Sequence, residues 1–229
     1  LQLLDVVNPE ILFSNYVYVS GTSPVFIEHF RLLSEKIIQL KSLNSKDFVI
    51  DIGSNDGTLL KFFKEKQIKI LGIDPAVKIA NEATARGIPT LTQFFDEKLA
   101  EKIKIENGLA SVIMANNVFA HIDDLDSVTK GVSNLLNADG IFVFEVSYLR
   151  DVIENNLFDT IYHEHLCYHS LKPLKKYFER FGLELFDAER VSSHGGSIRC
   201  FVQKKFGKFN VSNELNHLIK YEEENGFFK

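Results

Sequence analysis

Residues 48–63, FVIDIGSNDGTLLKFF, place a short apolar run directly before a turn with two glycines and an amphipathic run. Five consecutive residues that are mostly Val, Ile and Phe are typical of a strand buried on both faces, as in a parallel sheet. The apolar residues after Gly57 recur at helical spacing. The segment therefore predicts a strand, a turn and a helix, which restricts the chain to the α/β fold class.

The same alternation continues for most of the chain. We expect strands at the apolar runs 48–52, 68–73, 88–92, 109–115 and 140–146. Helices are expected between them, at 57–66, 76–86, 95–104 and 123–137, the last one ending in a turn at NADG (137–140). A helix near 171–181 and two facing strands, 183–191 and 197–205, complete the pattern.

Five alternating strands followed by a closing hairpin predict a doubly wound, Rossmann-like sheet whose final strand is antiparallel. We divide the chain into an aromatic-rich helical lid segment (1–46), a cofactor-binding α/β domain (47–206) and the start of a C-terminal region (207–229). Because the chain begins with Leu and ends in the charged run YEEENGFFK, we read both ends as cuts in a longer protein.

Composition narrows the choice of partners. A net charge of −5 argues against nucleic acid, whose binders use clustered Lys and Arg, so we expect a small-molecule substrate. The two cysteines, Cys167 and Cys200, form no CxxC pair, which indicates a reduced, cytoplasmic protein. No apolar run is long enough to span a bilayer, so we expect no membrane association, and we favour a monomer.

The turn after the first expected strand has the spacing D-x-G-x-x-x-G. It contains Asp51, Gly53, Ser54, Asn55 and Gly57. Glycines let the backbone approach a ligand closely, and the start of the following helix presents free N–H groups. The spacing is neither that of a phosphate-binding P-loop nor the dinucleotide pattern G-x-G-x-x-G. We predict a cofactor-binding turn, with a ligand-free glycine turn as the alternative.

Further polar residues follow the next two strands. Asp74, in the run GIDPA with Pro75, is placed to accept hydrogen bonds from both hydroxyls of a ribose, which suits an adenosyl ligand and NAD equally. Gln93, Phe94 and Phe95 are placed to flank an adenine ring by stacking. The chain has 20 Phe residues, so we expect at least one of Phe94 and Phe95 to pack in the core.

The fourth strand leads into ANNVFAHIDD. Asn116 and Asn117 are suited to hydrogen bonds with a cofactor, and His121 follows at the same edge of the sheet. In the alternative interpretation the asparagines are turn formers and His121 begins a helix capped by Asp123 or Asp124.

The densest group of ionisable side chains follows the fifth strand, in IYHEHLCYHS. Its members are Tyr162, His163, Glu164, His165, Cys167, Tyr168 and His169. A histidine beside a carboxylate offers a base near neutral pH, so we favour acid–base chemistry and expect no metal. The alternative is a metal site made by the H-x-H pair, a third histidine and Cys167. His194, in SSHGGSIR, either joins the substrate pocket or is a polar residue of a glycine hairpin.

Taken together, these motifs resemble the sugar C-methyltransferases that act on nucleotide-linked 4-keto-deoxyhexoses. The resemblance covers nearly all of residues 5–205 and depends on PEILFSNYVYVSGTS, DIGSNDGTLL, GIDPA, NNVFAHIDD, FDTIYHEHLCYHS and SHGGSIR. It implies a class I methyltransferase fold, S-adenosylmethionine as cofactor and a nucleotide-linked keto-sugar as substrate. It also implies a zinc module before this domain and an α/β domain after it, so zinc is expected only in that preceding module.

The resemblance further implies the roles of individual residues. His165 is the expected base, with Tyr162, Glu164, His121 and Tyr16 around the reacting carbons. A neutral imidazole can remove the proton next to a ketone if hydrogen-bond donors stabilise the enolate that forms. We expect Glu164 to orient or polarise a histidine.

Tyr18, His163 and His194 are assigned to substrate binding. The remaining alternatives are O- or N-methylation of a sugar or small metabolite, a non-catalytic module that binds S-adenosyl ligands, and a nicotinamide dehydrogenase.

Overall fold

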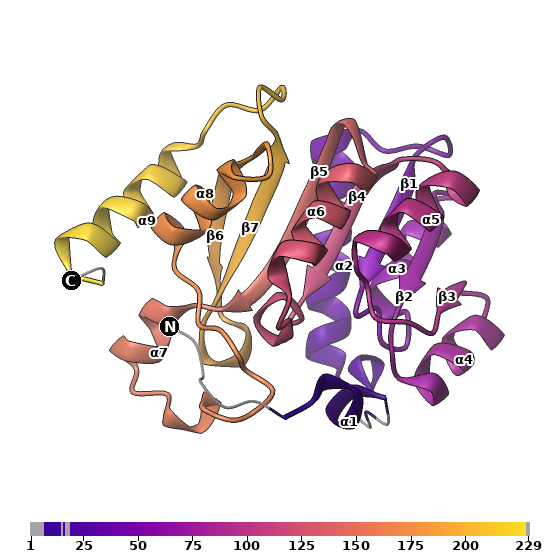
Figure 1. Cartoon of the computed structure of the whole chain (residues 1–229), viewed down its shortest axis with the longest axis horizontal. Helices are drawn as coiled ribbons and strands as arrows, with labels where there is room; N and C mark the ends of the chain where they lie inside the picture. The colour runs from indigo at the N-terminus through magenta and orange to yellow at the C-terminus, as the bar shows by residue number, and fades with distance from the viewer. Residues whose placement is uncertain (1–6, 15, 17–18, 228–229) are drawn as a thin grey trace.

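The computed structural model describes residues 7–14, 16 and 19–227, apart from the side chain of His194. Within this part of the chain, the strands form a seven-stranded sheet in the order β3-β2-β1-β4-β5-β7-β6 (Figure 1). They are β1 (Phe48–Ile52), β2 (Lys69–Ile73), β3 (Thr90–Leu91), β4 (Ala110–Asn116), β5 (Leu136–Ser147), β6 (Leu183–Val191) and β7 (Ser197–Lys204). The first five strands pair in parallel, and β7 runs antiparallel between β5 and β6. The predicted doubly wound sheet with an antiparallel final strand is confirmed.

Helices cover both faces of the sheet. The face toward the viewer in Figure 1 carries α5 (Glu97–Asn107), α6 (Leu125–Leu135), α8 (Leu171–Glu179) and α9 (Asn213–Glu224). The opposite face carries α2 (Pro24–Lys41), α3 (Thr58–Glu65) and α4 (Val77–Ala85). Two short helices, α1 (Pro9–Phe13) and α7 (Leu149–Glu154), and the 3-10 helices η1 (Ser20–Thr22), η2 (Phe119–His121), η3 (Phe158–Thr160) and η4 (Ser193–Gly195) belong to the connections.

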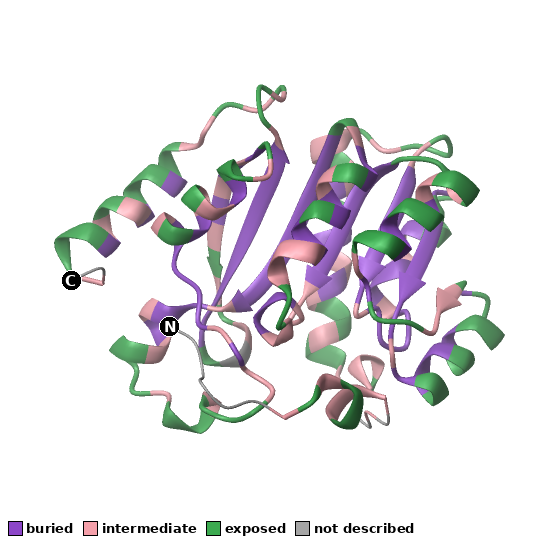
Figure 2. Cartoon of the chain, viewed as in Figure 1, coloured by how far each residue is buried: buried purple, intermediate pink, exposed green. Residues whose placement is uncertain are grey.

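The sheet is buried on both faces because its strands are apolar on both faces. In β5, Phe142 and Phe144 pack under α6 and α8, whereas Ile141 and Val143 pack toward α2 and α3. Figure 2 shows the central strands as almost continuously buried, while the outer surfaces of the helices are exposed. This burial explains why the strands appear in the sequence as unbroken apolar runs.

Two expected boundaries are wrong. The third strand, expected at 88–92, contains only Thr90 and Leu91. The segment 137–140, expected as a helix end and turn, belongs to β5, because Leu136 leaves α6 in an extended conformation and pairs with Ala110 of β4. Leu136 is fully buried, so its backbone polar groups need hydrogen-bond partners. Pairing in the sheet meets this need, and the chain passes from α6 into β5 without a separate turn.

The last helix, α9, packs against β6 and α8. Its Glu222 is fully buried and accepts hydrogen bonds from the backbone N–H groups of Leu171 and Lys172, at 2.7 and 3.1 Å, and from the hydroxyl of Tyr148, at 2.8 Å. A carboxylate at this position caps the N-terminus of α8 and interacts favourably with the helix dipole. Among the described residues, no helix combines the length and the apolar character needed to cross a bilayer.

Candidate active site

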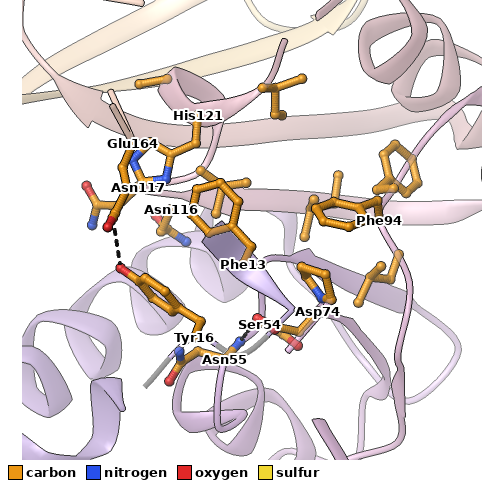
Figure 3. Close-up of a pocket in the computed structure, with 18 of the residues that line it drawn as sticks. Phe13, Tyr16, Ser54, Asn55, Asp74, Phe94, Asn116, Asn117, His121 and Glu164 are labelled. Carbon is orange, nitrogen blue, oxygen red and sulfur yellow. Dashed lines mark hydrogen bonds between the residues drawn. The ribbon is translucent and has the colours of Figure 1, made fainter. Parts of the chain in front are cut away.

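A cavity of about 790 Å³ opens at the carboxyl edge of the parallel strands. The residues that follow β1, β2, β4 and β5 line it, together with parts of the N-terminal segment and of the connection after α7. Figure 3 shows residues from these separate segments facing one another across the cavity. This is the position at which an open α/β sheet binds its ligands, beside the point where the strand order reverses between β1 and β4.

Two glycines shape the turn after β1. Gly53 has φ +68°, and a Cβ atom there would lie 2.2 Å from Cγ2 of Val118, so no larger residue fits between the turns after β1 and β4. Gly57 has φ +78°, and a Cβ there would lie 2.7 Å from Ile88. Gly53 lines the cavity and Gly57 does not, so Gly57 supports the turn from behind.

Asp74, at the end of β2, holds this turn in place. Its Oδ2 accepts a hydrogen bond from the N–H of Asn55 at 2.8 Å, and its Oδ1 accepts one from the N–H of Ala76 at 2.9 Å. Each carboxylate oxygen keeps a second lone pair that can accept a hydrogen bond from a ligand hydroxyl. The side-chain oxygen of Asn55 in turn accepts from the N–H of Ser20, at 2.9 Å, which connects the turn to the N-terminal segment.

Several buried polar atoms on the cavity wall have no hydrogen-bond partner among the described residues. They are Oδ1 of Asp51, Oγ of Ser54, and both side-chain polar atoms of Asn116. Burial, and then the charge of Asp74, raise the pKa of Asp51 to about 8. Burial also raises the pKa of Asp74. Because buried polar atoms are almost always paired, this wall is built to bind a polar ligand.

The remaining expected cofactor residues also line the cavity. Phe94 is 42% exposed, whereas Phe95 is 7% exposed and belongs to the hydrophobic core, so one of the two rings packs in the core as expected. Pro75 and Asn117 lie on the same wall. Asn117 has φ +55°, and its N–H donates to the carbonyl of Glu145 at 2.7 Å.

His165 has a defined tautomer. Its Nδ1 lies 2.8 Å from the carbonyl oxygen of Thr160, which can only accept, so Nδ1 carries a proton. In the neutral ring Nε2 is therefore unprotonated, and it lies 3.3 Å from the hydroxyl of Tyr162. Burial raises the pKa of Tyr162, so this residue stays a phenol. Both residues line the cavity, which gives it a base with a hydroxyl beside it.

Glu164 does not make the contact that we expected. The ring of His165 is held by the backbone of Thr160, whereas Oε2 of Glu164 accepts a hydrogen bond from the hydroxyl of Tyr16 at 3.3 Å (Figure 3). This bond joins the N-terminal segment to the connection after α7. A backbone carbonyl leaves no signal in the sequence, which is why Thr160 was missed.

An aromatic stack unites the expected catalytic residues. The rings of Phe13 and His121 are stacked, with centroids 5.7 Å apart and planes inclined by 9°. The centroid of His121 lies 5.1 Å from that of His165. Sequence reasoning named His121 and His165 but missed Phe13, whose only signal was its place in the aromatic run before α2.

The cluster from Tyr162 to His169 divides between two places. Cys167, Tyr168 and His169 line a second cavity of about 250 Å³ and not the main one. Burial lowers the pKa of His169 to about 4, and its ring packs 5.6 Å from that of Phe119. Within the described part of the chain, no three His, Cys, Asp or Glu side chains are arranged to hold a metal ion, so the alternative metal site does not assemble there.

The three residues assigned to substrate binding are placed differently. His163 is exposed and lies outside the lining of the main cavity. The backbone of His194 forms part of η4, at the carboxyl edge of the sheet, while Tyr18 lies outside the described residues.

The cavity is lined by acidic side chains. Apart from Asp51, which its pKa of about 8 keeps mostly protonated at neutral pH, they are Asp56, Asp74, Asp96, Asp123, Asp124, Asp159 and Glu164. Of the described residues on this lining, none is Lys or Arg. Opposite charges attract more strongly where water is partly excluded, so the site favours a cationic ligand.

Residues 26–188 match the methyltransferase domain family. The chain is 36% identical over 226 residues to the C-methyltransferase NovU of Streptomyces niveus. The aligned region covers 99% of this chain and 54% of that protein. The chain thus spans about half the length of this curated relative.

Solved structures share the architecture at low sequence identity. Magnesium protoporphyrin IX methyltransferase from Synechocystis with bound SAH superimposes with a TM-score of 0.61 at 13% identity, covering 78% of this chain and 83% of that one. A protein of Pyrococcus horikoshii gives a TM-score of 0.63 at 14% identity, covering 82% and 95%. At these identities the likeness establishes the fold.

Proposed function

The chain belongs to the methyltransferase domain family, and from this we propose that it transfers the methyl group of S-adenosylmethionine to a carbon atom next to the ketone of a nucleotide-linked 4-keto-deoxysugar. The observation that carries this proposal is the presence, on one cavity, of two complementary walls. One wall has unpaired buried polar atoms at the carboxyl ends of β1 and β4, and the other has His165 with an unprotonated Nε2.

The first wall fits S-adenosylmethionine. The carboxylate of Asp74 has lone pairs left for the ribose hydroxyls, and Asp51, Ser54 and Asn116 offer the unpaired polar atoms that its amino-acid part requires. The acidic lining suits the positive charge of a sulfonium and an ammonium group. When bound, this cofactor supplies an electrophilic methyl group.

The second wall fits proton removal from carbon. A saturated carbon atom next to a ketone becomes a nucleophile when it loses a proton, and the ketone makes that loss possible because the charge passes to the oxygen. Nε2 of His165 can accept this proton, while Nδ1 keeps its hydrogen bond to Thr160 and holds the ring in place as it becomes cationic.

Hydrogen-bond donors near His165 can stabilise the enolate oxygen. The hydroxyl of Tyr162 lies 3.3 Å from Nε2, and the ring of His121 lies within 5.1 Å of His165, measured between centroids. Tyr16 approaches the same place from the N-terminal segment, and because its single hydroxyl proton is donated to Glu164, it can serve the enolate oxygen only after that bond is exchanged. Preorganised donors of this kind act most strongly where water is partly excluded.

The similarity to a C-methyltransferase supports carbon as the acceptor atom. Incubation of the intact protein with S-adenosylmethionine and a panel of nucleotide-linked 4-keto-deoxysugars, followed by mass spectrometry, tests both the activity and the substrate class. We expect a product heavier by one methyl group. We also expect enzyme-dependent exchange of the hydrogen next to the ketone with deuterium from solvent.

The exchange measurement separates carbon methylation from its competitors. Methylation without hydrogen exchange at that carbon would indicate an oxygen or nitrogen acceptor. Binding of S-adenosylhomocysteine without any methylated product across the panel would indicate a non-catalytic module.

A further inference from the structure

A row of charged side chains crosses the α2 face of the sheet beside the cavity. Glu189 on β6, Arg199 on β7 and Glu145 on β5 are neighbours in strand register, and the next residue in the row is Asn116 on β4, which lines the cavity. The side chain of Glu145 is fully buried and that of Arg199 is 8% exposed. The proposed chemistry uses none of the three charged residues.

The row is tightly hydrogen-bonded. Nε and Nη2 of Arg199 donate to Oε2 of Glu145 at 3.1 and 2.9 Å, and Nη1 donates to Glu189 at 2.7 Å. Oγ of Ser193 donates to Oε1 of Glu145 at 2.5 Å. Burial acts to raise the pKa of Glu145, but the hydrogen bond from His29 and the charge of Arg199 hold it below its usual value. Glu145 is therefore a buried carboxylate with both oxygens occupied.

Helix α2 contacts this row at two points. Nε2 of His29 lies 3.0 Å from Oε2 of Glu145 and 3.1 Å from Nη2 of Arg199. If the proton of the neutral imidazole is on Nε2, the ring donates to Glu145, and if it is on Nδ1, the ring accepts from Arg199. His29 is thus held in either tautomer. Two helical turns further on, Lys36 pairs with Glu189 from the same side of the helix.

The two halves of α2 are anchored in different ways. Leu33 and Ile37, in the second half, are fully buried against the sheet. The first buried residue of the helix is Phe30, and no described residue from 7 to 29 is buried, so the first six residues of α2 and the segment before it lack such an anchor. His29 supplies a polar one, at the point where Phe26 and Phe30 line the cavity.

The segment just before α2 contacts the turn after β1 (residues 51–57), which we call the cofactor turn. Ser20, just before α2, donates its N–H to the side chain of Asn55, and the N–H of Asn55 donates to Asp74. A shift at the start of α2 would therefore disturb the turn that contacts the ligand.

We infer that His29 is a positioning residue, through which the buried Glu145–Arg199 pair holds the start of α2 against the cofactor turn. The inference depends on the proposed function only for the identity of the ligand. Because His29 contacts a buried charge pair, loss of these contacts should cost more free energy than loss of an exposed ion pair.

The test compares His29→Ala with His29→Gln in the intact protein, with His217→Ala, at an exposed position on α9, as the matched control. For His29→Ala we expect the Kd for S-adenosylhomocysteine, measured by calorimetry, to rise roughly tenfold, the size of a hydrogen bond to a charged group. We also expect faster hydrogen exchange in residues 19–29 and a modest fall in the thermal midpoint. His29→Gln keeps both a donor and an acceptor, so it should restore most of the affinity.

Unchanged affinity and unchanged exchange in His29→Ala would overturn the inference. So would a Gln variant as weak as the Ala variant with an equally lowered thermal midpoint, because that pattern indicates a general structural role. If the wild-type protein bound no S-adenosylhomocysteine, the proposed function would fail, whereas the exchange measurement would still decide whether His29 holds the start of α2.

Discussion

The turn after β1 and the connection 158–165 border the same cavity but are built in opposite ways. In the turn, every residue from Asp51 to Gly57 except Gly53 is buried, and a hydrogen bond from the N–H of Asn55 to Asp74 helps to fix its path. In the connection, no residue from 158 to 165 is buried, and Phe158 is 75% exposed. The side proposed to bind the cofactor is thus part of the core, whereas the side proposed to carry the chemistry depends on a few polar and aromatic contacts.

Under the proposed function, this difference assigns cofactor binding to the turn after β1 and the chemical step to the connection 158–165. A turn whose shape is set by buried strands keeps that shape with or without ligand. A connection joined by contacts such as Tyr16 with Glu164 can rearrange when a substrate enters. Substitutions on the two sides should therefore have distinct consequences for affinity, turnover and stability.

The largest effect is expected from His165→Asn, on the reaction side. Loss of the base should lower turnover about 10²- to 10⁴-fold, with the affinity for S-adenosylhomocysteine unchanged, because the cofactor turn does not depend on this ring. Single-turnover kinetics and calorimetry measure the two quantities, and His217→Asn is the control. Full turnover in His165→Asn would mean that another residue removes the proton.

On the cofactor side, Asp74→Asn should do the reverse. The amide turns a donor toward one of the two backbone N–H groups, and it loses the charge that a ribose would contact. We expect affinity for S-adenosylhomocysteine to fall roughly 10- to 100-fold, by analogy with hydrogen bonds to charged groups. Calorimetry measures this fall, with the exposed Asp139→Asn as the control. Unaltered affinity would remove Asp74 from the ligand site.

The buried turn should also give the protein a pH-dependent stability. The pKa of Asp51 rises from its ordinary value of 3.8 to about 8, so between these values the folded state binds a proton that the unfolded state does not. The free energy of unfolding should therefore fall as the pH rises through this range, by at most about 1.4 kcal/mol per pH unit, and become level above it.

Urea denaturation at several pH values, analysed by linear extrapolation, measures this slope. Asp51→Asn should reduce it, and Asp139→Asn should leave it as it is. An equal slope in the wild type and in Asp51→Asn would show that Asp51 is ionised in the folded protein.

The smallest effect is expected from Phe13→Leu. This change removes a ring stacked on His121 and keeps most of the volume, so turnover should fall roughly 2- to 10-fold, the size of an aromatic pair contribution. Steady-state kinetics measure it, and Phe13→Tyr, which keeps the ring, should stay near wild type. A loss as large as that of His165→Asn would mean that Phe13 contacts the reacting atoms.

The same contrast explains what the sequence could predict. Most of the strands and the turn after β1 were predictable because local patterns determine them: apolar runs, glycines at fixed spacing, and polar residues at strand ends. The bounds of β3 and the start of β5 were not, because pairing within the sheet sets them. Asp51, Asp74 and Asn116 were identified in this way, and all three line the cavity.

The reaction side was predictable only as a set of residue types. IYHEHLCYHS contains no periodicity that separates His165, which faces the cavity, from His169, which is buried against Phe119. The stack of Phe13 on His121 joins residues more than 100 positions apart, and the acceptor at Thr160 is a backbone atom. Contacts of these two kinds come from the tertiary fold.

In the proposed reaction, the acidic lining also affects release of the cofactor product. Methyl transfer converts a sulfonium into a neutral thioether, so reactant and product differ by one positive charge while their shapes are nearly the same. A wall of carboxylates, with no Lys or Arg among its described residues, retains the charged form more strongly than the neutral one. In the proposed reaction the chemical step itself would thus weaken the binding of the cofactor product, and added salt should narrow the difference in affinity between the two forms.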